Sequence, residues 1–205
     1  MNWISALLGN LNYTTIFILM LLESTVVPVP SELVVSPAAY HAAGGHLNVL
    51  LVVLFATIGA DVGASINYVA AYFLGRPIIY KFANSHIGHL CLLNQEKVEK
   101  SEKYFDDHGK VATITGRLIP GIRHLISIPA GLARMNFGSF LLFTTIGAGV
   151  WNCILAGLGW YLYSVVPEDQ LEDKILEYGE YIKYCIIALV LLAIVYFVIN
   201  HKMKK

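Results

Sequence analysis

The sequence predicts an all-α integral membrane protein, and three features of composition and pattern lead to this fold class. Of the 205 residues, 57% are hydrophobic and only 14% are charged, well below the roughly 25% of charged residues found in soluble domains. Long apolar runs follow one another, and prolines interrupt two of them. The formal net charge is zero, so overall charge indicates neither a nucleic-acid partner nor attraction to a membrane surface.

Three apolar runs are long enough to cross a bilayer as helices: residues 47–74, 137–163 and 181–200. Only Asp61 interrupts the first run. Gly59 and Gly63 in the same run predict close contact with a neighbouring helix. Trp151, in the second run, is expected to pack within the protein or at the membrane interface.

The first interrupted segment lies near the N-terminus. Residues 13–22 are apolar but too short for the roughly 20 residues that a spanning helix needs. Pro28 and Pro30 then prevent a continuous helix through residues 23–32. An apolar run resumes at residues 33–43, so this segment is predicted to be a broken hairpin.

The second interrupted segment is residues 116–131, which place two arginines and two prolines among apolar residues. Pro120 and Pro129 predict a chain broken into short helical pieces. Arg117 and Arg123 cannot lose their charge, so at membrane depth they must face partners, water or an anionic ligand. We interpret the segment as a re-entrant, broken helix that builds a site inside a membrane protein.

The polar segments predict the orientation of the chain. Residues 94–108 form a helix of interleaved Glu and Lys at the membrane surface or in water, and Gly109 is expected to end it. Lysines and arginines concentrate in the 76–110 loop and in the 201–205 tail, which places both in the cytoplasm. The acidic 165–180 loop then lies outside.

A repeat follows from the order of these segments. Residues 23–74 form a proline-broken hairpin followed by a spanning helix, and residues 117–163 do the same. If the hairpins enter from opposite faces, they form the inverted repeat seen in many secondary transporters. The chain is then one membrane domain, 1–205: first hairpin and helix 13–75, cytoplasmic loop with amphipathic helix 76–110, second hairpin and helix 111–164, extracytoplasmic acidic loop 165–180, last transmembrane helix 181–200 and basic tail 201–205.

Five ionisable residues lie within these apolar segments: Glu23, Glu32, Asp61, Arg117 and Arg123. If all five faced lipid, the free-energy cost would be on the order of 10 to 17 kcal/mol, so they must be paired with one another or in contact with water. Two interpretations remain open. The arginines form structural ion pairs with the acids, or their guanidinium forks hold a phosphate. Both hold if a carboxylate occupies the arginines when the site is empty and leaves, on protonation, when phosphate arrives.

Two histidine patterns offer further candidate ligands. His124 neighbours Arg123 and could assist phosphate binding, although a histidine beside a site is as often packing. His86, His89 and Cys91 have a spacing reminiscent of a metal cluster, but no fourth ligand lies nearby. We therefore expect no metal site, no cofactor and no catalytic residue.

The motifs together resemble the DedA family of bacterial inner-membrane proteins, which share the VTT domain of eukaryotic lipid scramblases. The resemblance covers roughly residues 15–165. It is carried by Glu23…Pro28-x-Pro30-x-Glu32, the glycine-rich helix around Asp61 to Tyr68 with Leu74-Gly75-Arg76, Gly116-Arg117-x-x-Pro120-x-x-Arg123, Pro129-Ala130-Gly131…Met135 and Gly147…Trp151.

The resemblance implies a transporter with two opposed re-entrant hairpins. Several members are linked to flipping undecaprenyl phosphate or phospholipid, often with the proton-motive force. It implies a functional acid at Glu23 or Glu32 and an essential arginine pair at Arg117 and Arg123.

One acidic position departs from the family pattern. In many members an aspartate follows the glycine that matches Gly63, but here that position is Ala64, and Asp61 lies nearly one turn earlier.

The function predicted is therefore a flippase for a phosphate-bearing lipid (undecaprenyl phosphate or phospholipid) in the bacterial cytoplasmic membrane, coupled to protons and with a cytoplasmic C-terminus. Its partners are a membrane lipid and protons, with no nucleic acid, and a homo-oligomer is left open. The alternatives are an intramembrane lipid-phosphate enzyme and a membrane scaffold or stress-homeostasis protein of the cell envelope.

Overall fold

The computed structural model describes residues 10–25, 30–75, 95–119, 123, 125–167 and, singly or in short groups, 170–171, 173–175, 177–178, 181, 184 and 188. For residues 74, 95–104, 106 and 107 it describes the backbone alone. All regular structure in these residues is helical. The elements are α2 (Tyr13–Glu23), α3 (Glu32–Ala43), α4 (Val49–Ala70) with the π-helical turn η1 (Ala71–Gly75), α7 (Gln95–Leu118), α8 (Ser127–Leu132) and α9 (Phe137–Tyr163).

Helices α4 and α9 are long and apolar enough to cross a membrane, which confirms the predicted helices in residues 47–74 and 137–163. Asparagine side chains begin both. Asn48 and Asn136 each accept a hydrogen bond from a backbone N–H of the first turn, at 2.9 and 3.0 Å, and so satisfy donors that have no partner within the helix. The predicted third helix, residues 181–200, lies almost entirely outside the described residues.

Both predicted breaks are present. Helix α2 ends before Pro30 and α3 begins after it, while Pro28 lies outside the described residues. Helix α7 ends at Leu118, just before Pro120, which is also outside them. Pro129 occupies the first turn of α8, where a missing N–H removes no intrahelical hydrogen bond. The prolines thus separate short helices, and Pro129 helps to start one.

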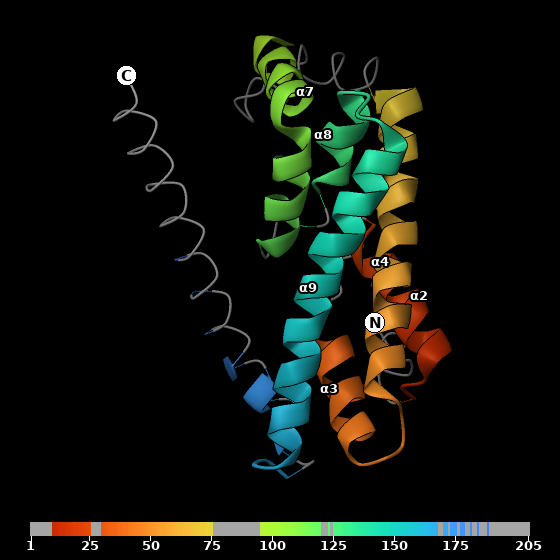
Figure 1. Cartoon of the computed structure of the whole chain (residues 1–205), viewed down its shortest axis with the longest axis vertical. Helices are drawn as coiled ribbons and strands as arrows, with labels where there is room; N and C mark the ends of the chain where they lie inside the picture. The colour runs from red at the N-terminus through yellow and green to blue at the C-terminus, as the bar shows by residue number, and fades with distance from the viewer. Residues whose placement is uncertain are drawn as a thin grey trace.

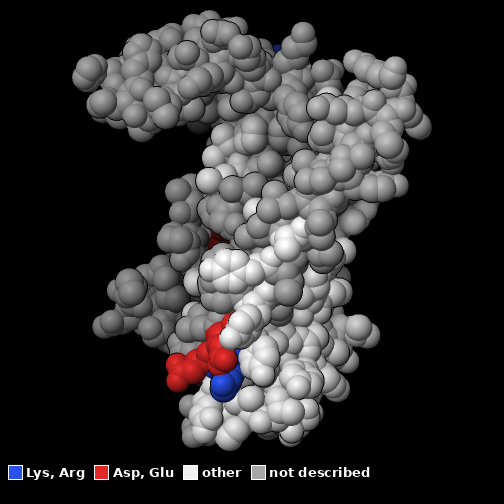
Figure 2. All heavy atoms as spheres, turned by 90° about the vertical axis from the view of Figure 1, so that its left-hand side faces the viewer, with Lys and Arg blue, Asp and Glu red and all other residues white. Residues whose placement is uncertain are grey.

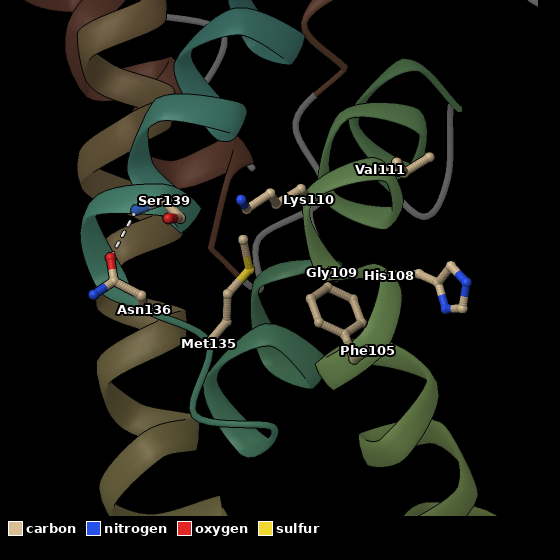
Figure 3. A pocket seen from close by; sticks show the side chains of 8 residues that line it. All are labelled: Phe105, His108, Gly109, Lys110, Val111, Met135, Asn136 and Ser139. Carbon is tan, nitrogen blue, oxygen red and sulfur yellow. Dashed lines mark hydrogen bonds between the residues drawn. The ribbon is translucent and has the colours of Figure 1, made fainter.

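The predicted end of the 94–108 helix at Gly109 is wrong, because α7 continues to Leu118. Gly109 serves close packing instead. A Cβ atom there would lie 3.0 Å from the Phe105 ring and 3.2 Å from the Met135 sulfur, and Figure 3 shows these residues side by side. The longer helix carries Arg117 in its last turn.

The short helices lie at opposite ends of the long ones (Figure 1). Helices α2 and α3 lie toward the lower end in this view, and α7 and α8 toward the upper end. Helix α2 packs mainly on α4 and α3 mainly on α9, whereas α7 packs on α9 and α8 on α4. Each pair therefore places its first helix on the long helix that follows it in the chain and its second helix on the other long helix.

Glycines bring these helices together. Gly63 of α4 meets the backbone carbonyl of Leu21, and a Cβ there would lie 2.8 Å from the Cβ of Ser24. Gly59 meets the carbonyl of Phe17 in the same way, which confirms the predicted contact of Gly59 and Gly63. Close backbone approach through small residues is the usual basis of helix association in membranes.

The exposed surface of the long helices is apolar. Large side chains of α4 that are exposed include Leu50, Leu54, Ile58, Ile66 and Val69. In Figure 2, most described atoms on the face shown are neutral, and the coloured ones gather near the end where α9 finishes. Lys174 and Glu177 form an exposed ion pair in that region. This is the surface that a helix facing lipid requires.

Candidate functional site

One ion-paired cluster joins the two interrupted segments. Glu23 is the last residue of α2, Glu32 is the first of α3, and Arg123 lies in the connection between α7 and α8. Arg123 Nε is 2.9 Å from Glu23 Oε1, and its Nη2 is 3.6 Å from Glu32 Oε2. The break between α2 and α3 thus directs two carboxylates to one guanidinium. All three side chains are buried or nearly so, which favours their pairing.

Trp151 of α9 covers this arginine. The Arg123 guanidinium carbon lies 4.8 Å from the centre of the Trp151 ring, within the range of a cation–π interaction. The indole Nε1 donates a hydrogen bond to Ser31 Oγ at 3.1 Å. Trp151 was predicted only to pack, and its contact with Arg123 was not predicted. Its spacing of one turn from Gly147 was the available signal.

Arg117 has different surroundings. It is 3% exposed, and its Nε and Nη2 have no hydrogen-bond partner among the described residues. Glu23 and Asp61 act on it electrostatically, but neither forms an ion pair with it. A buried donor left unsatisfied costs on the order of 1–3 kcal/mol, and more for a charged group. Arg117 therefore has donors available for a ligand.

The two arginines line one small cavity together with Met20, Glu23, Ala60, Ala148, Trp151 and Asn152. The volume of this cavity, counted as the space that the centre of a water molecule can reach, is about 10 Å³. This is close to the minimum that holds one water molecule. A phosphate group is larger than that. In this conformation the site is closed, with Glu23 on Arg123.

Asp61 does not join this cluster. Its Oδ2 accepts a hydrogen bond from Thr145 Oγ1 at 2.7 Å, and its Oδ1 has no partner among the described residues. It lines a separate hollow of about 700 Å³, formed mainly by apolar residues of α4 together with Leu141. The structure therefore brings together Glu23, Glu32 and Arg123, whereas Asp61 accepts a hydrogen bond from Thr145 and interacts with Arg117 only electrostatically.

Several polar residues near the site were absent from the sequence predictions. Ser24 Oγ donates to Glu23 Oε2 at 3.2 Å, and Asn67 Nδ2 donates to the carbonyl of Ser24 at 3.0 Å. Asn152 Nδ2 donates to Thr57 Oγ1 at 3.1 Å. Asparagines within apolar runs were the signal that could have found them, because unpaired amides are costly in a bilayer.

A second hollow, of about 500 Å³, lies between α7 and the start of α9 (Figure 3). Its wall includes Lys110 and His108, which are exposed, and Asn136, whose amide oxygen accepts a hydrogen bond from the backbone N–H of Ser139. No described carboxylate lines it. This hollow is separate from the arginine cluster.

The remaining predicted ligands fall on other parts of the chain. His124 lies outside the described residues, as do His86, His89 and Cys91. Within the described ranges, no three His, Cys, Asp or Glu side chains are grouped as a metal site would require.

Comparison with known proteins identifies the family of this chain. The VTT domain matches residues 29–161, more than half of the chain. An "Alkaline phosphatase-like protein" of Lactococcus lactis subsp. lactis is 34% identical over 152 residues, 74% of this chain and 71% of the relative. "Undecaprenyl phosphate transporter A" of Staphylococcus aureus is 33% identical over 156 residues, 76% of each chain. "Protein DedA" of Escherichia coli is 27% identical over 172 residues, 82% of this chain and 75% of the relative.

No solved structure matches the chain. The two apolar helices agree with further relatives that are named as membrane proteins. With the domain match and identities above 30%, the chain belongs to the VTT-domain (DedA) family of membrane proteins.

Proposed function

We propose that this protein carries a phosphate-bearing lipid, undecaprenyl phosphate or a phospholipid, across the bacterial cytoplasmic membrane without changing it chemically. The observation that carries the proposal is Arg117, a buried cation with two unsatisfied donors beside a second arginine. A guanidinium fork matches two phosphate oxygens. The name of the Staphylococcus aureus relative supports undecaprenyl phosphate as one substrate.

Binding requires an exchange at Arg123. Glu23 and Glu32 neutralise Arg123 in the closed site, and the cavity has no room for phosphate. An arriving phosphate takes the place of a carboxylate, and a proton on that carboxylate removes the competing charge. The carboxylates thus couple lipid movement to protons. His124, next to Arg123 in sequence, is proposed to assist phosphate binding.

The contact pattern of the helices supports an inverted repeat in a single membrane domain. The main contacts of α2 and α3 with the long helices correspond to those of α7 and α8, with the two long helices exchanged. The short pairs also lie toward opposite ends of the long helices (Figure 1). In transporters built from inverted repeats, rocking of one repeat against the other exposes a central site to each face in turn.

Reconstitution tests this function. Purified protein is placed in liposomes with labelled undecaprenyl phosphate or phosphatidylethanolamine, and transbilayer movement and released inorganic phosphate are both measured. We expect lipid movement without phosphate release. Arg117→Gln should lower the rate at least tenfold, and Arg117→Lys should recover only part of it, because an ammonium lacks the fork. Lys110→Gln, which changes an exposed cation on the same helix, should not lower it.

The same assay tests the enzyme alternative. Relatives in Lactococcus are named alkaline phosphatase-like, which favours a hydrolase as the second candidate. Release of inorganic phosphate that Arg117→Gln abolishes would support that candidate and contradict the carrier. If the protein shows neither lipid movement nor phosphate release, the result favours a scaffold.

Proton coupling has its own test. Glu23→Gln and Glu32→Gln keep the shape of the side chain but remove its titration. We expect transport by at least one variant to vary less with pH than transport by the wild type. A wild-type pH profile in both variants would contradict a role for these acids.

A further inference from the structure

Asn152 of α9 has a buried side-chain acceptor to which no described residue donates a hydrogen bond. The residue is 1% exposed. Its Nδ2 donates to Thr57 Oγ1, and the Thr57 hydroxyl donates to the carbonyl of Val53 at 2.8 Å. Because the hydroxyl proton is already used, Thr57 can only accept from Asn152, which fixes the orientation of the amide. Its Oδ1 is left without a donor among the described residues.

Asn152 lines the same cavity as the two arginines. Three donor atoms there lack partners in the described structure: Nε and Nη2 of Arg117 and Nη1 of Arg123. The oxygens of Glu23 are already engaged, Oε1 with Arg123 and Oε2 with the Ser24 hydroxyl. In the described structure, Asn152 therefore has an acceptor without a donor, and the two arginines that line the same cavity have three donors without acceptors.

A ligand that pairs with both the free arginine donors and the free Asn152 acceptor needs a negative charge and a hydrogen-bond donor. We take the donor to lie on the charged group itself, because Asn152 and the two arginines line one cavity, so a single phosphate can face all three residues. A phosphate monoester meets both needs when it carries one proton, with anionic oxygens for the arginines and a P–OH for Asn152. Its second ionisation has a pKa of about 6, so near neutral pH part of it carries that proton. A phosphodiester has no P–OH.

We propose that Asn152 is a specificity-determining residue that selects lipids ending in a phosphate monoester over phosphodiester lipids. This inference rests on the proposed lipid carrier and narrows its substrate class. Thr57 acts as a positioning residue, because its hydroxyl accepts from the Asn152 Nδ2 and so leaves the Asn152 Oδ1 free for a ligand.

The test uses three lipids in proteoliposomes of the full chain. Undecaprenyl phosphate and phosphatidic acid are monoesters with unlike tails, and phosphatidylglycerol is an anionic diester. The wild type should move both monoesters faster than the diester. Asn152→Leu, which keeps the side chain's approximate size, should lower the monoester-to-diester rate ratio about tenfold, the effect of one ordinary hydrogen bond. Thr57→Val frees the amide and should lower the ratio by a smaller factor.

A matched control lies on the same helix. Thr144 is also fully buried, and its Oγ1 also lacks a partner among the described residues, but it does not line the cavity. Thr144→Val should leave the rate ratio unchanged. A similar fall in Thr144→Val and Asn152→Leu would overturn the proposal, because it would mean that loss of any buried polar group in α9 lowers the ratio.

Competition with inorganic phosphate distinguishes recognition of the lipid headgroup from recognition of its tail. It carries the same P–OH, so it should slow monoester movement in the wild type and do so less in Asn152→Leu. Equal inhibition in both proteins overturns the role of Asn152. Movement of one monoester but not the other would place selection in the tail and also overturn it.

The two proposals fail in different ways. A wild type that moves monoester and diester at one rate, with the same ratio in Asn152→Leu, overturns the selection and leaves the carrier intact. A wild type that moves none of the three lipids overturns the carrier itself and the selection with it.

Discussion

Arg117 and Arg123 are identical side chains from one short segment, yet their surroundings differ. Arg123 contacts two carboxylates and an indole ring, whereas Arg117 has two donors without partners in the described structure. The first arrangement holds the interrupted segments together, and the second leaves binding capacity free. In this conformation structural pairing therefore belongs to Arg123, whereas phosphate binding is proposed for both arginines: Arg117 has donors available for it, and Arg123 gains them when a carboxylate leaves.

At this scale, Trp151 offers a stability prediction. Trp151→Ala removes a 3% exposed ring together with its contact to Arg123, so we expect a loss of about 3–5 kcal/mol from the cavity and a further ~1 kcal/mol from the cation–π contact. Thermal unfolding in detergent measures the change. Trp160→Ala, on the same helix but 49% exposed, should change stability little. An equal effect of both substitutions would contradict the contact described.

The sequence predicted the charged residues of the site but not all their partners. Charges in apolar segments are conspicuous because an unpaired charge in a bilayer is so costly, which is why Glu23, Glu32 and Arg123 could be grouped in advance. Asn152 and Trp151 were not assigned to the site, because a polar amide or an indole in a spanning helix has several ordinary roles. Their part in the cavity depends on which face of α9 meets Arg117 and Arg123, and that is set by tertiary packing.

Among the elements, the two long helices were predictable and the end of α7 was not. Residues 137–163 match α9 because hydrophobicity and length alone define a spanning helix. Gly109 alone is a plausible end for a helix. In the structure the helix continues through it, and Gly109 packs closely beside Phe105 and Met135. Packing thus overrides a local signal, and it decides where Arg117 lies.

Gly147 provides a prediction for how α7 and α9 fit together. A Cβ at Gly147 would lie 2.7 Å from the Cβ of Arg117, which is too close, so Gly147→Ala should push Arg117 from its place. We expect lipid movement to fall severalfold and stability to drop by about 1–3 kcal/mol from overpacking. Transport in liposomes and thermal unfolding measure these effects.

Gly149 is the matched control, two residues further along α9. A Cβ there would meet nothing within 4 Å, so Gly149→Ala should keep transport and leave stability equal or up to about 1 kcal/mol higher, since alanine favours a helix over glycine. Loss of transport in Gly149→Ala to the same degree would contradict the packing argument.

At the scale of the whole molecule, each described pair of short helices packs its first helix on the long helix that follows it and its second on the other long helix. Hydropathy gave the order of segments, but it could not show that α3 packs on α9 and α8 on α4. That exchange depends on contacts between residues far apart in the chain, such as the Ser36 hydroxyl donating to the carbonyl of Leu155 at 3.1 Å.

Orientation in the membrane is a prediction at this scale. Single cysteines at Lys110, near the start of α9, and at Ser164, which follows its other end, are placed in a chain whose native cysteines are replaced. With a membrane-impermeant maleimide on intact cells, Ser164→Cys should react, whereas Lys110→Cys should react only after permeabilisation, as the positive-inside rule requires. The reverse labelling would invert the proposed topology.

The tight closure around Arg117 and Arg123 bears on how the cell keeps its energy supply. A row of ionisable groups through a bilayer would short-circuit the voltage across it if water could thread between them. Among the described residues, the void that the two arginines line is about 10 Å³, the space of one water molecule and not of a continuous chain of them. A void of that size lets these arginines stay charged at membrane depth without a continuous water path beside them.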